Sequence, residues 1–208
     1  MQLDHLAVTC ADLGEGVAYV EDALGVTVQP GGQHPRFGTH NRLFRLGPGE
    51  YFEVIAPDPS ATGAPDQPLW FGLATAMHPR LGNWIVRVPD LALALALALA
   101  TGPVEAGDSV AMVRGDLSWD IAVPPDGSLP FGGGFPTLMS WQGTAPHPST
   151  RLTDQGISLT ALDISHPQAA AIAAMIGPHL PDPRLRFHVG SLALQATFAT
   201  PHGPRTLS

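Results

Sequence analysis

The sequence predicts an α+β fold in which two similar βαβββ modules pair around a cleft and a shorter βαββ unit follows. The main observation is an internal repeat, because residues 3–13 align without gaps with residues 81–91, at an offset of 78. Both copies show a short strand pattern, an Asp that can cap a helix and then an apolar helix, which indicates two modules that pack together. The composition agrees, since 44% of the 208 residues are hydrophobic and 23 Gly and 22 Pro provide many turns.

The first module, residues 1–59, is predicted to run strand, helix, strand, loop and hairpin. These elements fall at 3–10 (strand), 13–24 (helix), 26–29 (strand), 30–38 (loop), and 39–46 and 51–55 (hairpin). Asp12 is a good helix cap and Gly25 a good helix stop. The loop is predicted from its Pro and Gly residues, and the hairpin from two apolar runs around a Gly-Pro-Gly-Glu turn.

The second module, residues 80–143, repeats this order after a linker rich in Pro, Ala and Gly. It is expected to contain a strand from Leu81, a helix at 91–101, and strands at 104–113, 117–123 and 137–141, with a short helix before it between 69 and 80. Five Leu-Ala pairs in the 91–101 segment alternate with the period of a strand. Leu and Ala are strong helix formers, however, and Asp90 and Gly102 supply a cap and a stop, so we expect a largely buried helix.

Residues 150–208 are expected to form a third, shortened unit packed on the module pair, so that the whole chain is one compact domain. The predicted elements are a strand at 157–164, a helix at 167–176 and a closing hairpin at 185–189 and 192–199. Ser165 is predicted to cap the helix and Gly177 to end it.

Charge and cysteine content argue against several classes of partner. The chain has ten Arg, no Lys and 18 acidic residues, a net charge of −8, and no basic run. Nucleic acid is therefore not an expected partner, because phosphate binding needs clustered positive charge. The single Cys10 ends an apolar strand, where we expect an inert buried thiol. No secretory signal and no run long enough to span a membrane are present, so we expect a cytoplasmic protein.

Three segments of the first module carry a family resemblance: Leu-Asp-His-Leu-Ala-Val at 3–8, Gly-Thr-His-Asn at 38–41 and Tyr-Phe-Glu-Val-Ile-Ala-Pro at 51–57. Together with the repeat they resemble the vicinal oxygen chelate superfamily of glyoxalase I, extradiol dioxygenases and bleomycin-resistance proteins, and most of all its glyoxalase-like domain proteins. The resemblance covers residues 1–143. It implies two modules curled into a half-barrel cleft, with ligands from the first and last strands of each module on one divalent metal. Carried over, the metal ligands of the first module are His5 and Glu53.

The residue pattern agrees with this implication for the first module. Alternation along a strand places His5 on the face opposite Leu6, and Glu53 on the face opposite Phe52. Burial of Glu53 in an apolar strand requires a partner, which can be a metal, a histidinium or an arginine. Imidazole and carboxylate together suit Zn, Mn, Fe or Ni.

The second module departs from the pattern. Asn83 stands at the position of His5, and the position of Glu53 falls near Met139 or Ser140. Neither Asn83 nor Ser140 is a strong ligand for a transition metal, so half of a four-ligand shell is missing. The sequence thus leaves open both a divalent metal, with water or His40 completing a weaker shell, and a metal-free site.

The candidate catalytic residues are His40 and Glu53. His40 lies on a strand predicted to pair with that of Glu53, where it would act as a general base or hydrogen-bond donor, or else orient the loop at Gly38. Arg87 matches Thr9 in the repeat and is expected to face the cleft, where it would bind an anionic group or pair with Glu53. The expected substrate-binding residues are Asn83, Arg87, Ser140 and Trp141.

Two functions follow from these residues. The first is a lyase, isomerase or dioxygenase-type enzyme, in which a metal or polarising group at His5 and Glu53 stabilises an enolate-like oxyanion. The second is a metal-free protein that sequesters an apolar small molecule. Both expect a small organic ligand and neither expects nucleic acid or a membrane. Both modules lie in one chain, so a monomer suffices to form the cleft, and a homodimer is the alternative.

Overall fold

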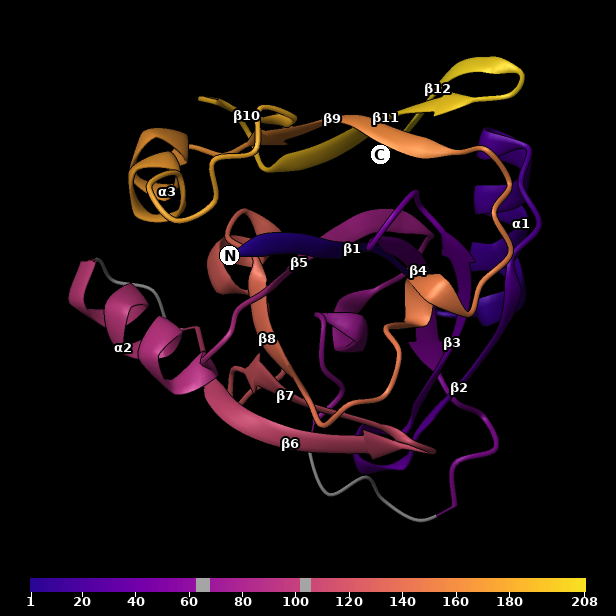
Figure 1. The fold of residues 1–208 in the computed structure, drawn as a ribbon, viewed down its shortest axis with the longest axis horizontal. Helices are drawn as coiled ribbons and strands as arrows, with labels where there is room; N and C mark the ends of the chain where they lie inside the picture. The colour runs from indigo at the N-terminus through magenta and orange to yellow at the C-terminus, as the bar shows by residue number, and fades with distance from the viewer. Residues whose placement is uncertain (63–67, 102–105) are drawn as a thin grey trace.

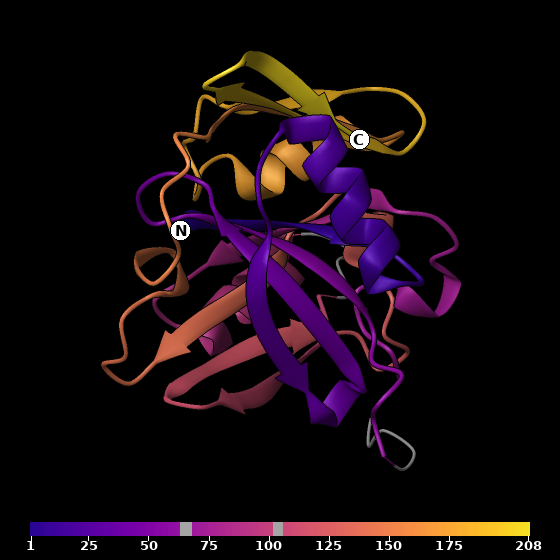
Figure 2. The same ribbon diagram turned by 90° about the vertical axis from the view of Figure 1, so that its right-hand side faces the viewer.

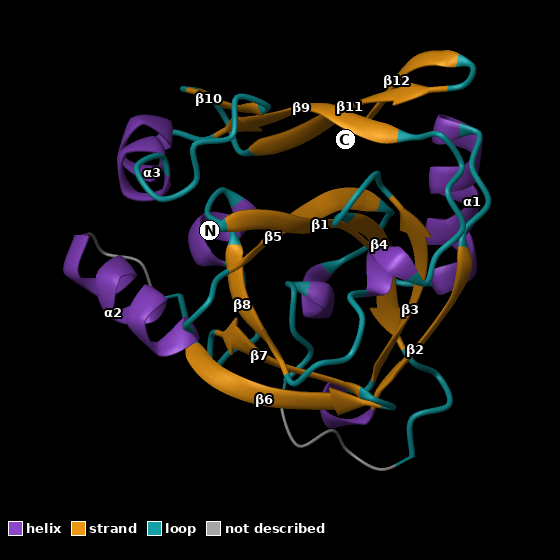
Figure 3. Cartoon of the chain, viewed as in Figure 1, coloured by secondary structure: helices purple, strands orange, loops and turns teal. Residues whose placement is uncertain are grey.

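The computed structural model describes residues 1–62, 68–101 and 106–208 of the chain. Its main element is an eight-stranded sheet in the order β2-β3-β4-β1-β5-β8-β7-β6, which curls round on itself (Figure 1). Among the described residues, a separate four-stranded sheet and three α-helices lie outside the curl (Figure 3). This mixed architecture with a large curled sheet confirms the predicted α+β half-barrel.

The first module forms its elements in the predicted order. They are β1 (Gln2–Thr9), α1 (Leu13–Leu24), β2 (Gln29–His34), β3 (Thr39–Arg45) and β4 (Tyr51–Pro57). The Asp12 carboxylate caps α1 by accepting a hydrogen bond from the backbone N–H of Glu15, and Gly25 ends the helix with a φ of 68°. Both predicted ends of this helix are confirmed.

The second strand corrects the prediction for this module. β2 occupies residues expected as the 30–38 loop, whereas residues 26–28, expected as strand, form none. Pro30 is tolerated because β2 is an edge strand of the sheet. Gly31 is required because a Cβ atom there would collide with Asn41, at a point where the pairing with β3 is irregular. Composition predicted a loop where Pro and Gly instead belong to an irregular edge strand.

The second module also follows the predicted order. Its elements are β5 (Arg80–Arg87), α2 (Leu91–Thr101), β6 (Asp108–Arg114), β7 (Leu117–Val123) and β8 (Thr137–Gln142). The Asp90 carboxylate caps α2 by accepting from the backbone N–H of Leu93. The predicted stop at Gly102 and the first residues of the strand expected at 104–113 lie outside the described residues. The helix is less buried than expected, because within residues 91–98 Leu93 is 59% exposed and Leu97 39% exposed, whereas Leu91 and Ala94 are buried.

Short 3-10 helices are found in four connections among the described residues. They are Pro35–Phe37, Leu73–Thr75, Pro130–Gly133 and Pro148–Thr150. The helix at Leu73–Thr75 confirms the short helix expected between residues 69 and 80.

The repeat is visible in the sheet as an approximate two-fold relation. β1 and β5 pair antiparallel at the centre, β1 pairs in parallel with β4, and β5 pairs in parallel with β8. Ala7 stands opposite Glu53, and its repeat counterpart Ile85 stands opposite Thr137. Thr137 is therefore the counterpart of Glu53, two residues before the expected position near Met139. The module boundaries at 1–59, 80–143 and 150–208 stay predictions.

The C-terminal unit forms the second sheet. Its elements are β9 (Ser158–Ser165), α3 (Ala169–Ile176), β10 (Leu185–His188), β11 (Ala193–Thr200) and β12 (Gly203–Leu207), with strand order β10-β9-β11-β12. The predicted hairpin of β10 with β11 is wrong, because these strands lie on either side of β9 and the hairpin is β11–β12. Ser165 ends β9, and Gln168 holds the N-cap position of α3 instead. Figure 2 shows this sheet over the larger one, beside α1.

The eight-stranded sheet separates two apolar clusters. The outer cluster lies between this sheet, the helices and the C-terminal sheet, and it contains Leu6, Val8 and Trp84. The inner cluster lies inside the curl and contains Ala7 and Ile85. Alternation along β1 and β5 produces this division. Of the helices described, none is both long enough and apolar enough to cross a membrane.

Candidate functional site

His5 and Glu53, which the sequence predicts together, meet inside the curled sheet. They are 4% and 5% exposed, and His5 Nε2 lies 3.5 Å from Glu53 Oε2. Their strands, β1 and β4, are paired in parallel. The Tyr51 ring stacks on the imidazole of His5 with 4.2 Å between ring centres, and its hydroxyl lies 3.5 Å from His5 Nε2. The two strands thus bring an imidazole, a carboxylate and a phenol to one buried place.

Asp4 is a site residue that the sequence reasoning missed. Regular alternation turns it away from His5, but an irregularity between Leu3 and His5 in the pairing of β1 with β5 breaks the alternation. The carboxylate is fully buried and accepts four hydrogen bonds, from His5 Nδ1 at 2.7 Å, Trp141 Nε1 at 2.9 Å, His147 Nε2 at 3.1 Å and Arg87 Nη1 at 3.2 Å. The sequence signal that could have identified Asp4 is a charged residue inside an otherwise apolar strand.

These contacts place two of the predicted substrate-binding residues. Arg87 bonds Asp4 and also donates to the carbonyl oxygen of Gly49 at 2.7 Å, so its guanidinium pairs with Asp4. Trp141 lines the interior of the curl beside Trp119. Asp4 therefore ties the first strand of one module to β5 and β8 of the other.

Asn41 holds the other side of Glu53. Its Nδ2 donates to Glu53 Oε1 at 2.5 Å, and its Oδ1 accepts from the backbone N–H of Gly32 at 2.8 Å. The Gly-Gly pair in β2 is explained by two close approaches, because a Cβ at Gly31 would collide with Asn41 and a Cβ at Gly32 would collide with the side chain of Arg114. The Gly-Thr-His-Asn segment thus contributes its Asn, rather than its His, to the interior.

Hydrogen bonds and neighbouring charges outweigh burial in shifting the pKa values of His5, Glu53 and Asp4. Burial lowers the pKa of His5, but hydrogen bonds and charges from Asp4 and Glu53 outweigh it and raise the pKa above its usual value. Burial raises the pKa of Glu53, but the hydrogen bond and charge of His5 outweigh it and lower the pKa. For Asp4 burial also raises the pKa, and the bonds from His147 and His5 hold it well below its usual range. The two carboxylates therefore favour the protonated form of His5.

Arg114 reaches the same interior from the second module. It lies on β6, at the opposite edge of the sheet from β2, and its Nη1 donates to Asn41 Oδ1 at 3.2 Å. The same Nη1 lies 3.3 Å from His34 Nε2, and the guanidinium stands 5.9 Å from the centre of the Trp119 ring. Burial lowers the pKa of His34 to about 4, so its neutral ring accepts from Arg114. No motif marks Arg114 or His34, because only the curl of the sheet brings its two edges together.

The second-module counterparts of His5 and Glu53 bind each other. Asn83 Nδ2 donates to Thr137 Oγ1 at 2.9 Å, and both residues are buried. Ser140 donates to the carbonyl oxygen of Pro89 at 3.4 Å and alternates with Met139 and Trp141, which line the interior. The structure thus does not bring Asn83 or Ser140 into contact with the His5–Glu53 pair.

The donors in this interior do not fit a transition metal. Glu53 Oε1 is engaged by Asn41 and His5 Nδ1 by Asp4, so the first-module pair offers two donor atoms, His5 Nε2 and Glu53 Oε2. In the second module, Asn83 and Thr137 supply neither imidazole nor carboxylate. Throughout residues 1–62, 68–101 and 106–208, no three or more His, Cys, Asp and Glu side chains are grouped so that they can hold an ion. A shell for Zn, Mn, Fe or Ni needs at least three such donors.

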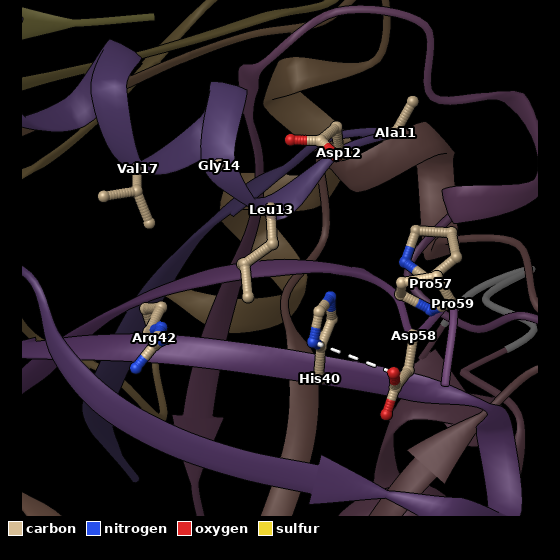
Figure 4. Close-up of a pocket in the computed structure, with 10 residues that line it drawn as sticks. All are labelled: Ala11, Asp12, Leu13, Gly14, Val17, His40, Arg42, Pro57, Asp58 and Pro59. Carbon is tan, nitrogen blue, oxygen red and sulfur yellow. Dashed lines mark ion pairs between the residues drawn. The ribbon is translucent and has the colours of Figure 1, made fainter. Parts of the chain in front are cut away.

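His40 lies on the opposite face of β3 from Asn41. It lines a surface groove of about 530 Å³ beside the start of α1, together with Arg42, Leu13 and Val17 (Figure 4). Its Nδ1 lies 3.9 Å from the carboxylate of Asp58. The structure therefore separates His40 from Glu53, and the catalytic role of His40 stays a prediction.

The interior beside the His5–Glu53 pair is nearly filled. His5, Glu53, Asn41, His34 and Arg114 line a cavity of about 20 Å³, which is room for one water molecule. The rest of its wall is largely aromatic: Trp70, Phe71, Trp119 and Trp141. The site is thus a small polar cavity inside an aromatic surround.

Comparisons with known proteins agree with this fold. A family model described as a glyoxalase-like domain matches residues 3–179. A solved structure of a hypothetical protein from Staphylococcus aureus is similar at a TM-score of 0.57 and 13% identity, over 85% of this chain and 74% of that one. Methylmalonyl-CoA epimerase from Mycobacterium tuberculosis has a TM-score of 0.43 and 21% identity, over 69% and 88% of the two chains.

A mutant of 4-hydroxymandelate synthase from Streptomyces coelicolor has a TM-score of 0.41 and 16% identity, over 72% of this chain and 51% of that one. No curated protein matches the chain. The match to the Staphylococcus aureus structure supports the fold alone, and the family model is the finding that covers most of the chain.

Proposed function

The chain belongs to the glyoxalase-like domain family, and we propose that it binds a small organic molecule inside the curled sheet without a transition metal. The observation that carries this proposal is the buried pair of His5 and Glu53, which faces the interior cavity and is neutralised by protein groups alone. The binding interior lies between the modules, because Arg114 and Trp141 of the second module line the same cavity.

The pair offers a ligand two complementary contacts. Protonated His5 donates a hydrogen bond from Nε2 to a carbonyl or other acceptor of the ligand. Glu53 Oε2, which lies 3.5 Å from that nitrogen, accepts from a hydroxyl or amide of the ligand. Arg114 supplies a further cationic donor. The ligand expected from these contacts carries an acceptor and a donor group close together.

Metal analysis and ligand binding together test the proposal. The untagged protein is stripped with a chelator, incubated with Zn, Mn, Fe or Ni, washed, and analysed for bound metal, with His5→Ala as control. We expect no near-stoichiometric metal in either protein. Metal bound to the wild type and lost in His5→Ala would refute the metal-free proposal.

Binding is measured by ligand-detected NMR with a set of small carboxylates, phenols and cyclic amides. We expect hits on the wild type that weaken by about 10-fold or more in Glu53→Gln, because one charge-assisted hydrogen bond contributes about 1.5–3 kcal/mol. His40→Ala is the matched comparison, since His40 lies on the other face of the neighbouring strand. Loss of binding in His40→Ala with retention in Glu53→Gln would move the site to the surface groove.

A second candidate function, proton transfer, is favoured by the adjacency of a cationic acid and an anionic base. Glu53 would take a proton from a carbon next to a carbonyl group, and His5 would stabilise the oxyanion that forms. Deuterium uptake from solvent into acetylacetone, followed by NMR, tests this reaction. A rate of deuterium uptake equal to the rate without protein would exclude proton transfer and leave ligand binding as the proposed function.

A further inference from the structure

Trp70 and Phe71 form what we call the aromatic plug, a pair of rings inserted into the interior from the connection between β4 and β5. They are 2% and 4% exposed, and they pack in the inner cluster with residues of both modules. Neither ring belongs to a strand of the eight-stranded sheet, and Figure 3 shows the short helical turn that follows them, Leu73–Thr75, inside the ring of strands. The plug therefore occupies the interior without being part of its wall of strands.

The indole of Trp70 is held as a ligand would be held. It stacks on Phe37 with 4.3 Å between ring centres and 6° between ring planes, and it meets the ring of His34 edge-on at 5.3 Å. Its Nε1 donates a hydrogen bond of 3.1 Å to Thr39 Oγ1, which is buried. One aromatic face, one ring edge and one acceptor thus define a slot for a flat molecule with a single donor.

The plug makes few hydrogen bonds to the rest of the described chain. Among the described residues, two hydrogen bonds join the segment 68–77 to other segments: the Trp70 indole to Thr39, and the backbone N–H of Gly72 to the carbonyl of Gly127 at 3.0 Å. The remaining backbone bonds of the segment are local, within its 3-10 turn. Phe71 also has a φ of 55°, a left-handed conformation that is unfavourable for a bulky residue. Apolar packing, rather than hydrogen bonding, keeps the plug in place.

We propose that the aromatic plug is a displaceable internal ligand, and that the molecule which replaces Trp70 is a planar aromatic compound with one ring N–H or O–H donor. This inference rests on the proposed function, because the replaced ring would lie beside the His5–Glu53 cavity. The cavity of about 20 Å³ cannot take an organic molecule while the plug is in place. Two aromatic side chains each bury about 150–250 Å², so their departure vacates a space that suits one aromatic ligand.

The contacts that are left open when the plug leaves favour an aromatic ligand. Phe37 keeps a free face, and Trp119 and Trp141 lie on β7 and β8. The Thr39 hydroxyl loses the indole N–H that donates to it and keeps its contact of 3.1 Å with His34 Nδ1. A flat ring regains the stacking on Phe37, and a donor on that ring regains the bond to Thr39. An aliphatic chain regains neither contact.

Binding kinetics of indole test the proposal in the wild type. A plug that must open first makes the observed binding rate level off as the indole concentration rises, at the rate of plug opening. In Trp70→Ala the competitor is absent, so we expect a rate linear in indole concentration and an affinity at least about 10-fold tighter than in the wild type. If Trp70→Ala does not fold, the levelling of the wild-type rate still decides the question.

The donor is tested with 1-methylindole, which lacks the ring N–H. We expect Trp70→Ala to prefer indole over 1-methylindole by about 2–10-fold, the value of one neutral hydrogen bond. Addition of Thr39→Val to this variant should abolish the preference. A preference that survives without the Thr39 hydroxyl would overturn the assignment of the donor contact.

Trp84→Ala is the matched control, because Trp84 is a comparably buried tryptophan of the outer cluster whose Nε1 donates to the carbonyl oxygen of Gly133. Binding of indole to both variants but not to the wild type, at indole concentrations 100 times the Kd of Trp70→Ala, would show that Trp70 only fills the core and would overturn the plug. That result leaves the proposed function standing, because the loss of small polar ligands in Glu53→Gln is measured without reference to indole.

Discussion

The side-chain amide of Asn83 donates a hydrogen bond of 2.9 Å to the hydroxyl of Thr137 at the place in the second module that His5 and Glu53 hold in the first. The two modules thus share a backbone arrangement and differ in chemistry at one pair of positions. A charged pair faces the cavity in one module, and a neutral, mutually satisfied pair stands in the other. The polar interior is consequently built on one side of the two-fold relation.

The Asn83–Thr137 pair should be needed for stability. Thr137→Val removes the acceptor and leaves a buried amide donor of Asn83 without its partner, which costs about 1–3 kcal/mol of unfolding free energy. Thr9→Val is the matched change with the opposite expected sign. The buried Thr9 hydroxyl has no hydrogen-bond partner among the described residues, and its removal should add about 1 kcal/mol. Urea denaturation of both variants measures the two effects. Equal losses in both would contradict this account.

Asp4 should be among the most costly buried residues to alter. Asp4→Asn replaces two acceptor oxygens with one acceptor and one amide that faces donors, and it leaves protonated His5 with less compensation. We expect a loss of about 3–5 kcal/mol at pH 7, measured by urea denaturation. The folded pKa of Asp4 lies well below 3.8, so the wild-type advantage is present above pH 3.8 and shrinks as the pH falls below it. A difference that is unchanged at pH 2.5 would argue against the charge as its cause.

Cys10 should be unreactive in the folded protein. Burial raises the pKa of its thiol to about 12 from an ordinary 9.0, and its Sγ donates to the carbonyl of Ile55. Three pKa units lower the thiolate population about 1,000-fold, so alkylation by iodoacetamide at pH 8 should be slower by at least about that factor than in urea. Mass spectrometry of the alkylated protein checks the rate. Fast modification without denaturant would show that the strand end opens.

The fold was predictable because its signals are local and repeated. Asp12, Gly25 and Asp90 mark helix ends through bonds made within a few residues, and the 78-residue offset reports two copies of one unit. The strand β2 was mispredicted because Pro30 and Gly31 satisfy tertiary requirements, an exposed sheet edge and a close approach to Asn41, that composition does not encode. The pairing order in the C-terminal sheet is likewise non-local.

The site was predicted in part, and the part that was missed depends on geometry. The pairing of His5 with Glu53 could be predicted for two reasons. Strand alternation places each of them on the face opposite its apolar neighbour, and the family resemblance implies that they bind together. Asp4 was missed because an irregularity in β1 breaks the alternation on which the prediction relied. Arg114 and His34 come from opposite edges of the sheet and meet only after it curls, so no spacing in the sequence relates them.

His34 should make stability fall in mildly acidic solution. Burial lowers its pKa to about 4 from 6.5, so the unfolded chain binds a proton between pH 6.5 and 4 that the folded protein does not, and stability declines as the pH falls through this window. The full difference of 2.5 pKa units corresponds to about 3 kcal/mol. A proton on His34 would also face the guanidinium of Arg114, 3.3 Å from its Nε2.

Other groups do not mask this effect above about pH 5.5. Asp4 and Glu53 have pKa values lowered from the ordinary 3.8 and 4.5, so both are charged in the folded and unfolded states there. His5 has a raised pKa, so its stabilising contribution is complete below pH 6.5 and is lost only as the pH rises above it. Urea denaturation between about pH 6.5 and 5.5 should therefore show an unfolding free energy that falls with pH in the wild type and stays level in His34→Gln. If His34→Gln keeps the slope, another buried group takes up the proton.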